Sequence, residues 1–214
     1  MIEAINIKKE FLSPTYIEVL KGISLEINDG LNIISGRSGS GKTTLMNVLS
    51  GLDNATSGNV IINATDITHL NKSSLDRFRR KNIGFVFQSV ALLSQFNAYE
   101  NVALMQKLVG QAEDRNLILN LFEEFGLIGK ENRSITELSG GEQQRIAIIR
   151  AIVNKPKIIF ADEPTAQLDF ASAQHVAKIF NKLSKEITIV MTTHDNEILS
   201  FADKIFKIED GILV

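Results

Sequence analysis

A glycine-rich segment in the first quarter of the chain constrains the fold more than any other feature. It consists of Gly36, Arg37, Ser38, Gly39, Ser40, Gly41, Lys42 and Thr43, and Thr44 follows it. An apolar run at residues 33–35 precedes the segment, and a helical pattern at residues 44–49 follows it. A strand, a glycine loop and a helix in this order point backbone N–H groups at a phosphate chain. Lys42 can neutralise the β- and γ-phosphates, and the hydroxyl of Thr43 can bind Mg²⁺. The alternative is a glycine-rich turn with an incidental lysine and threonine.

Apolar, β-branched runs alternate with helical patterns along the rest of the chain. Strands are predicted at residues 2–8, 31–35, 83–87, 157–161, 187–192 and 204–208, and helices at 42–49, 141–153, 171–183 and 196–200. The later strand runs are almost continuously apolar, which is typical of strands covered on both faces. We therefore expect an α/β domain with a mostly parallel sheet.

One stretch interrupts this alternation. From residue 89 to about 137 the apolar residues recur at helical spacing, around Val102, Leu108, Leu117 and Phe125, and no strand pattern is present. We interpret the stretch as a helical insertion between two strands of the sheet. The alternative is a pair of crossover helices with long loops.

Composition excludes several classes of function. With 214 residues and 44% hydrophobic content the chain can bury a core, and its net charge of −2 gives no reason to expect nucleic acid as a partner. The absence of cysteine excludes disulfides, cysteine zinc sites and iron–sulfur clusters. The uncharged run at residues 82–99 contains amides and hydroxyls that are costly in lipid, so we expect no membrane span. A basic cluster, Arg77, Arg79, Arg80 and Lys81, is expected to be a solvated face.

Two adjacent carboxylates end the apolar run at residues 157–161. Asp162 at the end of a strand beside the phosphate loop suits Mg²⁺ coordination. Glu163 would point to the opposite face of a regular strand. A turn at Pro164 can instead aim Glu163 at the γ-phosphate, where it would act as general base for the attacking water. The alternative is a strand end with solvated acids.

A second glycine-containing segment opens a predicted helix at residues 138–143. Its sequence is Leu-Ser-Gly-Gly-Glu-Gln, and Ser139 and Glu142 have the spacing of a capping box. A cap does not need Gly140 and Gly141, which cost backbone entropy. Two glycines and a hydroxyl at a helix N-terminus form a second phosphate cradle.

The two loops together resemble the phosphate loop and the signature motif of ABC-transporter ATP-binding subunits, and the resemblance extends over essentially the whole chain. It implies a P-loop, RecA-like core with an antiparallel β part near the N-terminus. It also implies one nucleotide-binding domain at residues 1–214, with a helical subdomain at about residues 89–153. The resemblance implies ATP hydrolysis with ATP and Mg²⁺ as cofactors. Two copies would pair head to tail, so that the signature of each copy closes on ATP held by the other.

Further positions match this family residue by residue. Phe11 resembles the aromatic residue that stacks on adenine, although the family more often has tyrosine there; the alternative is a core phenylalanine. Gln88 resembles the glutamine that senses Mg²⁺ and the γ-phosphate. Asp169 resembles the conserved acid of the D-loop, whereas Ala166 lacks the usual hydroxyl. His194 resembles the switch histidine that contacts the γ-phosphate, although an isolated histidine at a strand end is usually structural.

The subfamily resemblance rests on three segments, residues 19–25, 52–58 and 79–88. They resemble lipoprotein-release, macrolide-export and cell-division ATPases. This implies an integral membrane permease docked near residues 88–101, and a cytoplasmic location on the inner face of the membrane through that permease. Export or mechanotransmission of a peptide, bacteriocin, antibiotic or lipoprotein is expected, with cell-division signalling as the alternative. The permease, rather than this chain, would recognise the substrate.

Overall fold

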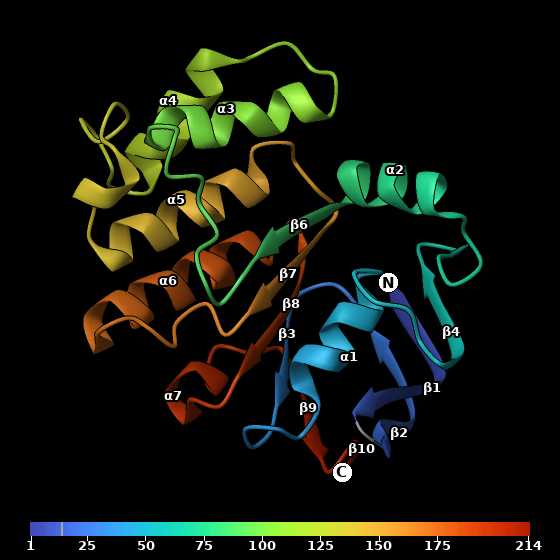
Figure 1. Ribbon diagram of the computed structural model, residues 1–214. Helices are drawn as coiled ribbons and strands as arrows, with labels where there is room; N and C mark the ends of the chain where they lie inside the picture. Colours follow the sequence, from blue (N-terminus) through green and yellow to red (C-terminus); the bar gives the residue numbers. More distant parts are fainter. Residues whose placement is uncertain (14) are drawn as a thin grey trace.

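Six strands form the central sheet of the computed structural model, which describes residues 1–13 and 15–214 (Figure 1). In spatial order they are β10 (Ile212–Leu213), β9 (Lys204–Glu209), β3 (Leu31–Ser35), β8 (Thr188–Thr193), β7 (Ile158–Asp162) and β6 (Ile83–Val86). The five from β9 to β6 are parallel, and β10 pairs with β9 in the antiparallel direction. The predicted parallel sheet is therefore confirmed, and five of the predicted strand runs form it.

Each face of this sheet contributes to a different hydrophobic core. Ile158 and Phe160 of β7 pack into one core, whereas their neighbours Ile159 and Ala161 pack into the other. Successive side chains of a strand point to opposite faces, so a strand buried on both faces must be apolar throughout. All five residues of β7 are buried. The continuous apolar runs in the sequence are explained by this double coverage.

A second, antiparallel sheet lies on one side of the central sheet (Figure 1). It contains β2 (Thr15–Ile27), β1 (Ile2–Ser13), β4 (Ser57–Ile62) and β5 (Thr65–Asp66), in that order. The antiparallel part near the N-terminus is confirmed, but only residues 2–8 of it were predicted as a strand. The first residues of β2 are exposed, so the apolar alternation that would reveal a strand is missing there.

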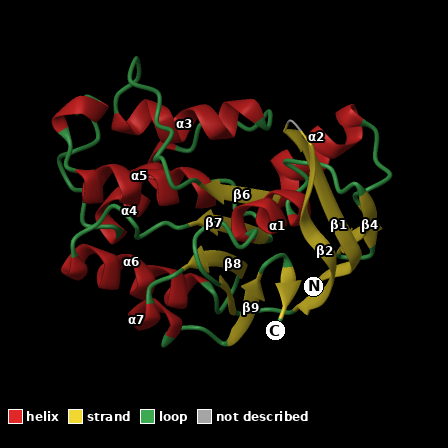
Figure 2. Ribbon diagram, turned by 60° about the horizontal axis from the view of Figure 1, so that its bottom comes forward, coloured by secondary structure: helices red, strands yellow, loops and turns green. Residues whose placement is uncertain are grey.

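The helices lie on both sides of the central sheet, and α1 (Lys42–Leu49) packs between this sheet and the antiparallel one. Figure 2 shows further helices gathered at one end of the molecule, whereas α2 (Lys72–Asn82) lies away from them, beside the antiparallel sheet. The gathered helices are α3 (Ala98–Leu108), α4 (Arg115–Glu124), α5 (Gly140–Ile152) and α6 (Phe170–Leu183), with the short η1 (Ile135–Glu137) and α7 (Asn196–Leu199). The helices α3, α4 and α5 follow β6 and precede β7, in the stretch where the sequence predicted an insertion. Within the described residues, no helix has the length and apolar character needed to cross a membrane.

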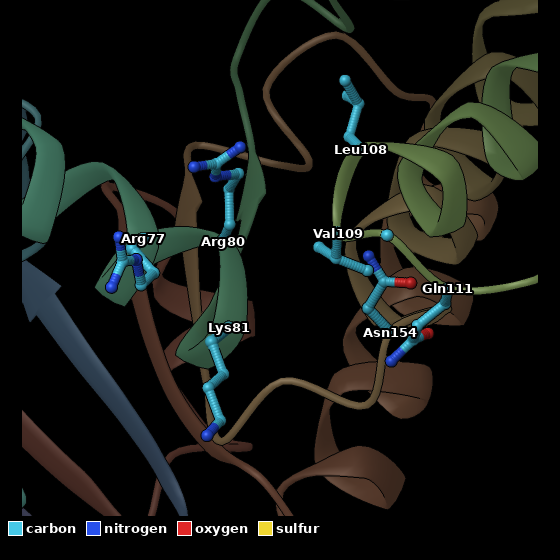
Figure 3. A pocket seen from close by; sticks show the side chains of 8 residues that line it. Arg77, Arg80, Lys81, Leu108, Val109, Gln111 and Asn154 are labelled. Carbon is cyan, nitrogen blue, oxygen red and sulfur yellow. The ribbon is translucent and has the colours of Figure 1, made fainter.

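Helix α2 (Lys72–Asn82) was not predicted from the sequence. Its apolar residues are few, and none of residues 72–82 is buried. Three residues of the basic cluster, Arg77, Arg80 and Lys81, are exposed, as expected. Arg79 is only partly exposed, because its guanidinium pairs with Asp76 at 2.6 Å and donates to the carbonyl of Gly51 at 2.7 Å. Figure 3 shows the exposed three on one side of a cleft of about 540 Å³. The opposite side is formed by Leu108, Val109, Gly110, Gln111 and Asn154.

Candidate functional site

The loops that follow the central strands meet at one edge of the sheet. In the parallel register Ser35 lies opposite Thr193 and Asp162 lies opposite Thr192, so the strands β3, β7 and β8 end side by side. In open α/β sheets, ligands bind outside the carboxyl ends of the strands. A cleft of about 620 Å³ opens here. It is lined by Val19, Arg37, Ser38, Gly39, Gly41, Lys42, Thr43, Thr44, Gln88, Glu163 and His194.

The phosphate loop is held closely against the rest of the protein. At Gly36 the backbone has φ of 155°, and a Cβ atom would lie 2.3 Å from the carbonyl oxygen of Ile208. No other residue type fits at this position without a shift of the backbone. The side chain of Lys42 is only 5% exposed, and its Nζ donates to the carbonyls of Gly36 at 3.0 Å and Arg37 at 3.1 Å. The ammonium group is therefore held inside the curve of the loop.

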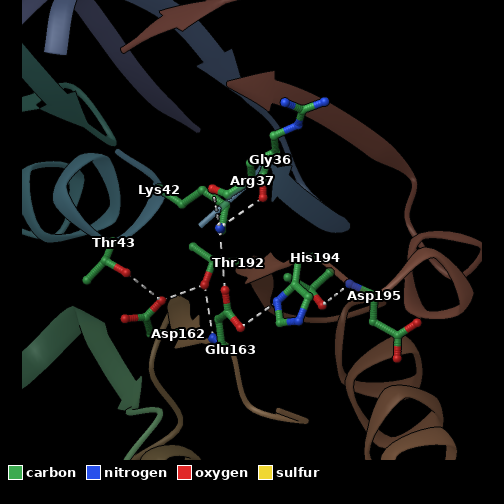
Figure 4. A network of polar contacts seen from close by, with 10 residues as sticks. Gly36, Arg37, Lys42, Thr43, Asp162, Glu163, Thr192, His194 and Asp195 are labelled. Carbon is green, nitrogen blue, oxygen red and sulfur yellow. Dashed lines mark hydrogen bonds and ion pairs between the residues drawn. The ribbon is translucent and has the colours of Figure 1, made fainter. Parts of the chain in front are cut away.

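Glu163 links the phosphate loop to the end of β8. Its Oε1 lies 3.4 Å from Nζ of Lys42 and its Oε2 lies 2.8 Å from Nδ1 of His194 (Figure 4). The backbone of Glu163 has φ of 41°, an uncommon value for a residue with a side chain. The turn after β7 thus directs Glu163 into the cleft, as the sequence interpretation required. A carboxylate in this position can accept a proton from a water molecule in the cleft.

Asp162 and Thr43 form a pair of oxygen donors beside the loop. The hydroxyl of Thr43 donates to Oδ1 of Asp162 at 3.2 Å. No group of three or more His, Cys, Asp or Glu side chains among the described residues could hold a metal ion by itself. Mg²⁺ usually binds one or two protein oxygens together with waters and substrate phosphates. A carboxylate and a hydroxyl beside a phosphate loop fit Mg²⁺ bound in this way, together with a nucleotide.

Thr192 is a member of this cluster that the sequence analysis missed. Its side chain is fully buried, and its hydroxyl donates to Oδ1 of Asp162 at 2.5 Å. The backbone N–H of Glu163 donates to the same hydroxyl at 2.9 Å (Figure 4). The only sequence signal for Thr192 was the presence of a threonine near the end of an apolar strand. Its partners follow only from the register of β7 and β8.

The segment at residues 138–143 lies outside this cleft and is satisfied by local contacts. Ser139 caps α5 in a capping box: its backbone N–H donates to Oε2 of Glu142 at 2.8 Å and its hydroxyl to the same oxygen at 3.0 Å. Oε1 of Glu142 lies 3.1 Å from Nζ of Lys130. The hydrogen bond from the backbone of Ser139, with Lys130, holds the pKa of Glu142 below its usual value. Ser139 and Gly140 are exposed, and Gly141 is half-buried.

Two further candidate residues also lie outside the cleft. Asp169 caps α6, accepting hydrogen bonds from the backbone N–H of Ser172 at 3.0 Å and from its hydroxyl at 2.7 Å. Ser172 in turn faces Gly141, so Asp169 lies beside the start of α5. Phe11 is 40% exposed in the β1–β2 hairpin, whose residue Val19 lines the cleft. The structure therefore brings together the predicted residues of the phosphate loop with Gln88, Glu163 and His194, but not Phe11, Asp169 or the signature segment.

Comparisons with known proteins agree on one family. The family model for ABC transporters matches residues 20–166. A lipoprotein-releasing system ATP-binding protein, LolD, of Syntrophotalea carbinolica is 39% identical over 217 residues, which cover 99% of this chain and 96% of the relative. A macrolide export ATP-binding/permease protein, MacB, of Campylobacter fetus is 42% identical over 219 residues, covering 100% of this chain. This chain spans about a third of the length of such MacB relatives, 32% and 34% in two of them.

A solved structure shares the fold over the whole chain. The ATP-binding cassette MJ0796, in a dimeric post-hydrolysis state bound to ADP and Pi, superimposes with a TM-score of 0.92. The two chains are 34% identical, and the match covers 100% of this chain and 96% of that one. The α/β core with parallel and antiparallel strands is therefore the fold of an ATP-binding cassette.

Proposed function

This chain belongs to the ABC transporter family of ATP-binding subunits and is an ATPase, and from this premise we propose that ATP-driven pairing of two copies drives a separate membrane permease. One observation carries the proposal: the chain has two glycine-containing helix starts suited to phosphate, and only one of them lies at the cleft that contains Lys42, Glu163 and His194. A signature segment with an exposed serine at a helix N-terminus is suited to a phosphate chain that another copy presents.

Within one copy we assign nucleotide binding to residues 36–44. Lys42, already surrounded by carbonyl groups in the loop, would neutralise the β- and γ-phosphates as its contact with Glu163 is exchanged for the nucleotide. Thr43, Asp162 and Gln88 would hold Mg²⁺, which would supply positive charge to neutralise the phosphates. Phe11 would stack on adenine, since its ring is partly exposed on the hairpin that reaches the cleft through Val19.

Hydrolysis would depend on positioning and on charge neutralisation around the γ-phosphate. We assign Glu163 as the base that orients water and His194 as the contact to the γ-phosphate, because the two side chains already form a pair at 2.8 Å. Ser139, Gly140, Gly141, Glu142 and Asp169 of the second copy would close the far side. This requires a head-to-tail homodimer, and the dimeric cassette of 34% identity supports it.

For the permease we propose export or mechanotransmission of a peptide, bacteriocin, antibiotic or lipoprotein, with cell-division-type signalling as the alternative. The names of the LolD and MacB relatives support the first assignment. We place the chain in the cytoplasm, on the inner face of the membrane through the permease. The helical subdomain would span residues 89–153, and the permease would dock between it and the core, near residues 88–101. Leu108 lines a hollow there together with Phe87 and Ala91, and it also lines the cleft of Figure 3. The cleft in Figure 3 lies between α2 and the end of α3, where Leu108 is 52% exposed.

The variant Glu163→Gln tests the dimer. It keeps the size of the side chain but cannot accept the proton from water, so we expect it to bind ATP and accumulate as a stable dimer. Size-exclusion chromatography with and without saturating ATP measures this. Glu186→Gln makes the same change at an exposed site, and we expect it to hydrolyse ATP normally. Lys42→Ala combined with Glu163→Gln should stay monomeric. A Glu163→Gln protein that remains monomeric at saturating ATP would contradict the proposal.

A cross-linking experiment tests the permease. The chain has no cysteine, so Leu108→Cys provides one reactive thiol at the cleft of Figure 3. We expect it to cross-link in native membranes to an integral membrane protein of the permease type, identified by mass spectrometry. Ile128→Cys is the control, because Ile128 is also exposed, at 69%, but lies on the loop after α4. Equal labelling by both cysteines, or labelling of neither, would refute docking at this cleft.

A further inference from the structure

Thr192 lies between the two acidic residues of the cleft. It is the fifth residue of β8 (Thr188–Thr193), and the parallel register places it directly opposite Asp162, the last residue of β7. Its neighbours Val190 and Met191 fill the two hydrophobic cores. Thr192 is as deeply buried as they are, yet it carries a hydroxyl. A polar group at such a position must be hydrogen-bonded or it destabilises the fold.

The geometry determines the direction of both hydrogen bonds of this hydroxyl. The backbone N–H of Glu163 can only donate, so the hydroxyl accepts from it at 2.9 Å. The hydroxyl proton is then free to donate to Oδ1 of Asp162 at 2.5 Å. The carbonyl of Thr192 accepts a second, longer hydrogen bond from the same N–H at 3.2 Å. One residue therefore binds both acidic residues, one through its carboxylate and the other through its backbone.

Both contacts act on groups whose orientation matters. Glu163 adopts a left-handed conformation, which costs conformational energy and persists only where the surroundings hold it. The two hydrogen bonds to its N–H are the observed restraint on that conformation. At Asp162 the hydroxyls of Thr192 and Thr43 share one carboxylate oxygen, Oδ1. That arrangement fixes the rotation of the carboxylate and directs Oδ2 away from Thr192.

We propose that Thr192 is a positioning residue for hydrolysis, which orients Asp162 toward Mg²⁺ and holds Glu163 in its turned conformation. The proposal rests on the roles of Asp162 and Glu163 proposed above. Thr192 itself is fully buried and is not among the residues that line the cleft. A valine at this position would fill the same space, but it would leave the N–H of Glu163 with its long contact only and would free the carboxylate of Asp162 to rotate.

The substitution Thr192→Val tests this with a side chain of nearly the same shape. A hydrogen bond to a charged group corresponds to roughly tenfold to hundredfold in an equilibrium or rate constant. We expect kcat to fall by about that factor while KM for ATP changes less than about threefold, which is the signature of an interaction used in the transition state. Thr192→Ser keeps the hydroxyl and should recover most of kcat. If Thr192→Val folds poorly, a comparison of Thr192→Ser with Thr192→Ala measures the effect of the hydroxyl instead, because these two variants differ only in that group.

A matched control lies on the same strand. Thr188 is also buried, and its hydroxyl donates to Oδ1 of Asp29 at 2.8 Å, at the opposite end of β8 from the cleft. Thr188→Val therefore removes the same kind of hydrogen bond from the same strand. We expect it to lower the melting temperature without changing kcat. If both valine variants lose kcat in proportion to their loss of stability, Thr192 is only structural and the proposal is wrong.

A binding measurement supplies a readout besides turnover. In the Glu163→Gln background, ATP-induced dimerisation can be followed as Mg²⁺ is titrated. We expect Thr192→Val to raise the Mg²⁺ concentration at half-saturation by about tenfold, and Thr192→Ser to restore it. An unchanged Mg²⁺ dependence together with an unchanged kcat overturns the proposal. A failure of the proposed function can be told apart from a failure of the Thr192 proposal. If Glu163 is not the base, Glu163→Gln alone hydrolyses ATP at the rate of the unmodified chain.

Discussion

The phosphate loop and the signature segment are both glycine-containing helix starts, but they are held in different ways. The loop is fixed by partners far away in sequence: Gly36 touches the backbone of Ile208, and Lys42 pairs with Glu163. The signature segment is fixed almost entirely by neighbours, through the box between Ser139 and Glu142. The base of the loop, at Ser40, Gly41 and Lys42, is buried in the fold, whereas Ser139 and Gly140 of the signature segment are exposed.

This difference indicates that the two segments have different roles, one in receiving the nucleotide and the other in meeting a second copy. A loop whose base the core holds can receive a nucleotide without large rearrangement of the chain, because Lys42 is already in place. The signature segment has its own local hydrogen bonds satisfied and leaves Ser139 and Gly140 facing outward. Such a segment can meet a second molecule at low cost, since little of the fold must change. The contrast supports the head-to-tail dimer and leads to three predictions.

The largest effect is expected from Gly36→Ala. Its Cβ would approach the carbonyl oxygen of Ile208 to 2.3 Å, and the backbone there cannot move aside cheaply, because the side chain of Ile208 is fully buried in the core. We expect unfolding free energy to fall by about 1–3 kcal/mol, the usual cost of overpacking. Chemical denaturation of the nucleotide-free protein measures it.

Gly39→Ala is the control in the same loop. Gly39 also has a positive φ, of 80°, but its Cβ would meet no atom of the described residues within 4 Å. It should therefore show only the conformational cost of a left-handed alanine, about 1 kcal/mol. Equal losses for the two variants would mean that the contact with Ile208 does not hold the loop.

We expect Gly140→Ala to raise the free energy of unfolding, whereas Gly36→Ala lowers it. Gly140 begins α5, and a Cβ there would meet no atom within 4 Å in the part of the chain that the structure describes. Alanine favours a helix over glycine by up to about 1 kcal/mol, so the monomer should become slightly more stable. In the Glu163→Gln background, however, the added methyl group should prevent the ATP-induced dimer, because it lies where the partner's phosphates would approach. Asn132→Ala, an exposed change nearby, should leave that dimer intact.

The same contrast explains what could be predicted from the sequence. The capping box was predictable because Ser139 and Glu142 are three residues apart and need no other element. The placement of Asp162 was predictable because a long apolar run ends there. Thr192 could not be assigned a role, because its hydrogen bonds depend on which residue of β7 lies opposite it, and register is a property of the sheet. Helix α2 was missed because its apolar residues are too few to give a helical period.

The arrangement of the cleft was thus inferred in part from family resemblance and in part from local chemistry. Local chemistry identified Lys42 and the resemblance added Gln88 and His194, and all three line one cleft of the structure. The resemblance also assigned Phe11 and Asp169 to nucleotide contacts, and these lie outside the cleft of a single copy. Asp169 lies beside the signature segment through Ser172, which is the location expected of a residue that faces a second copy.

The smallest effect is expected from Lys130→Met. Lys130 pairs with Glu142 at 3.1 Å on a partly exposed surface, and such pairs contribute about 0.5 kcal/mol or less. Because the pKa of Glu142 is lowered in the fold, first by the backbone of Ser139 and then by Lys130, the contribution is complete above the usual pKa of 4.5. It is lost as the pH falls through the lowered value. The difference in stability between Lys130→Met and the unmodified chain should therefore be present at neutral pH and disappear in acid.

The pair of Lys182 and Glu124 gives the control, since it is an exposed ion pair that does not touch the signature segment. Lys182→Met should leave ATP-induced dimerisation in the Glu163→Gln background unchanged. Lys130→Met should weaken that dimerisation slightly, because a looser Glu142 holds Ser139 less firmly at the helix start. If Lys130→Met and Lys182→Met behave alike in the dimer assay, local contacts do not preorganise the signature segment. Its geometry would then be set by the second copy, and the contrast with the phosphate loop would be even greater than the monomer indicates.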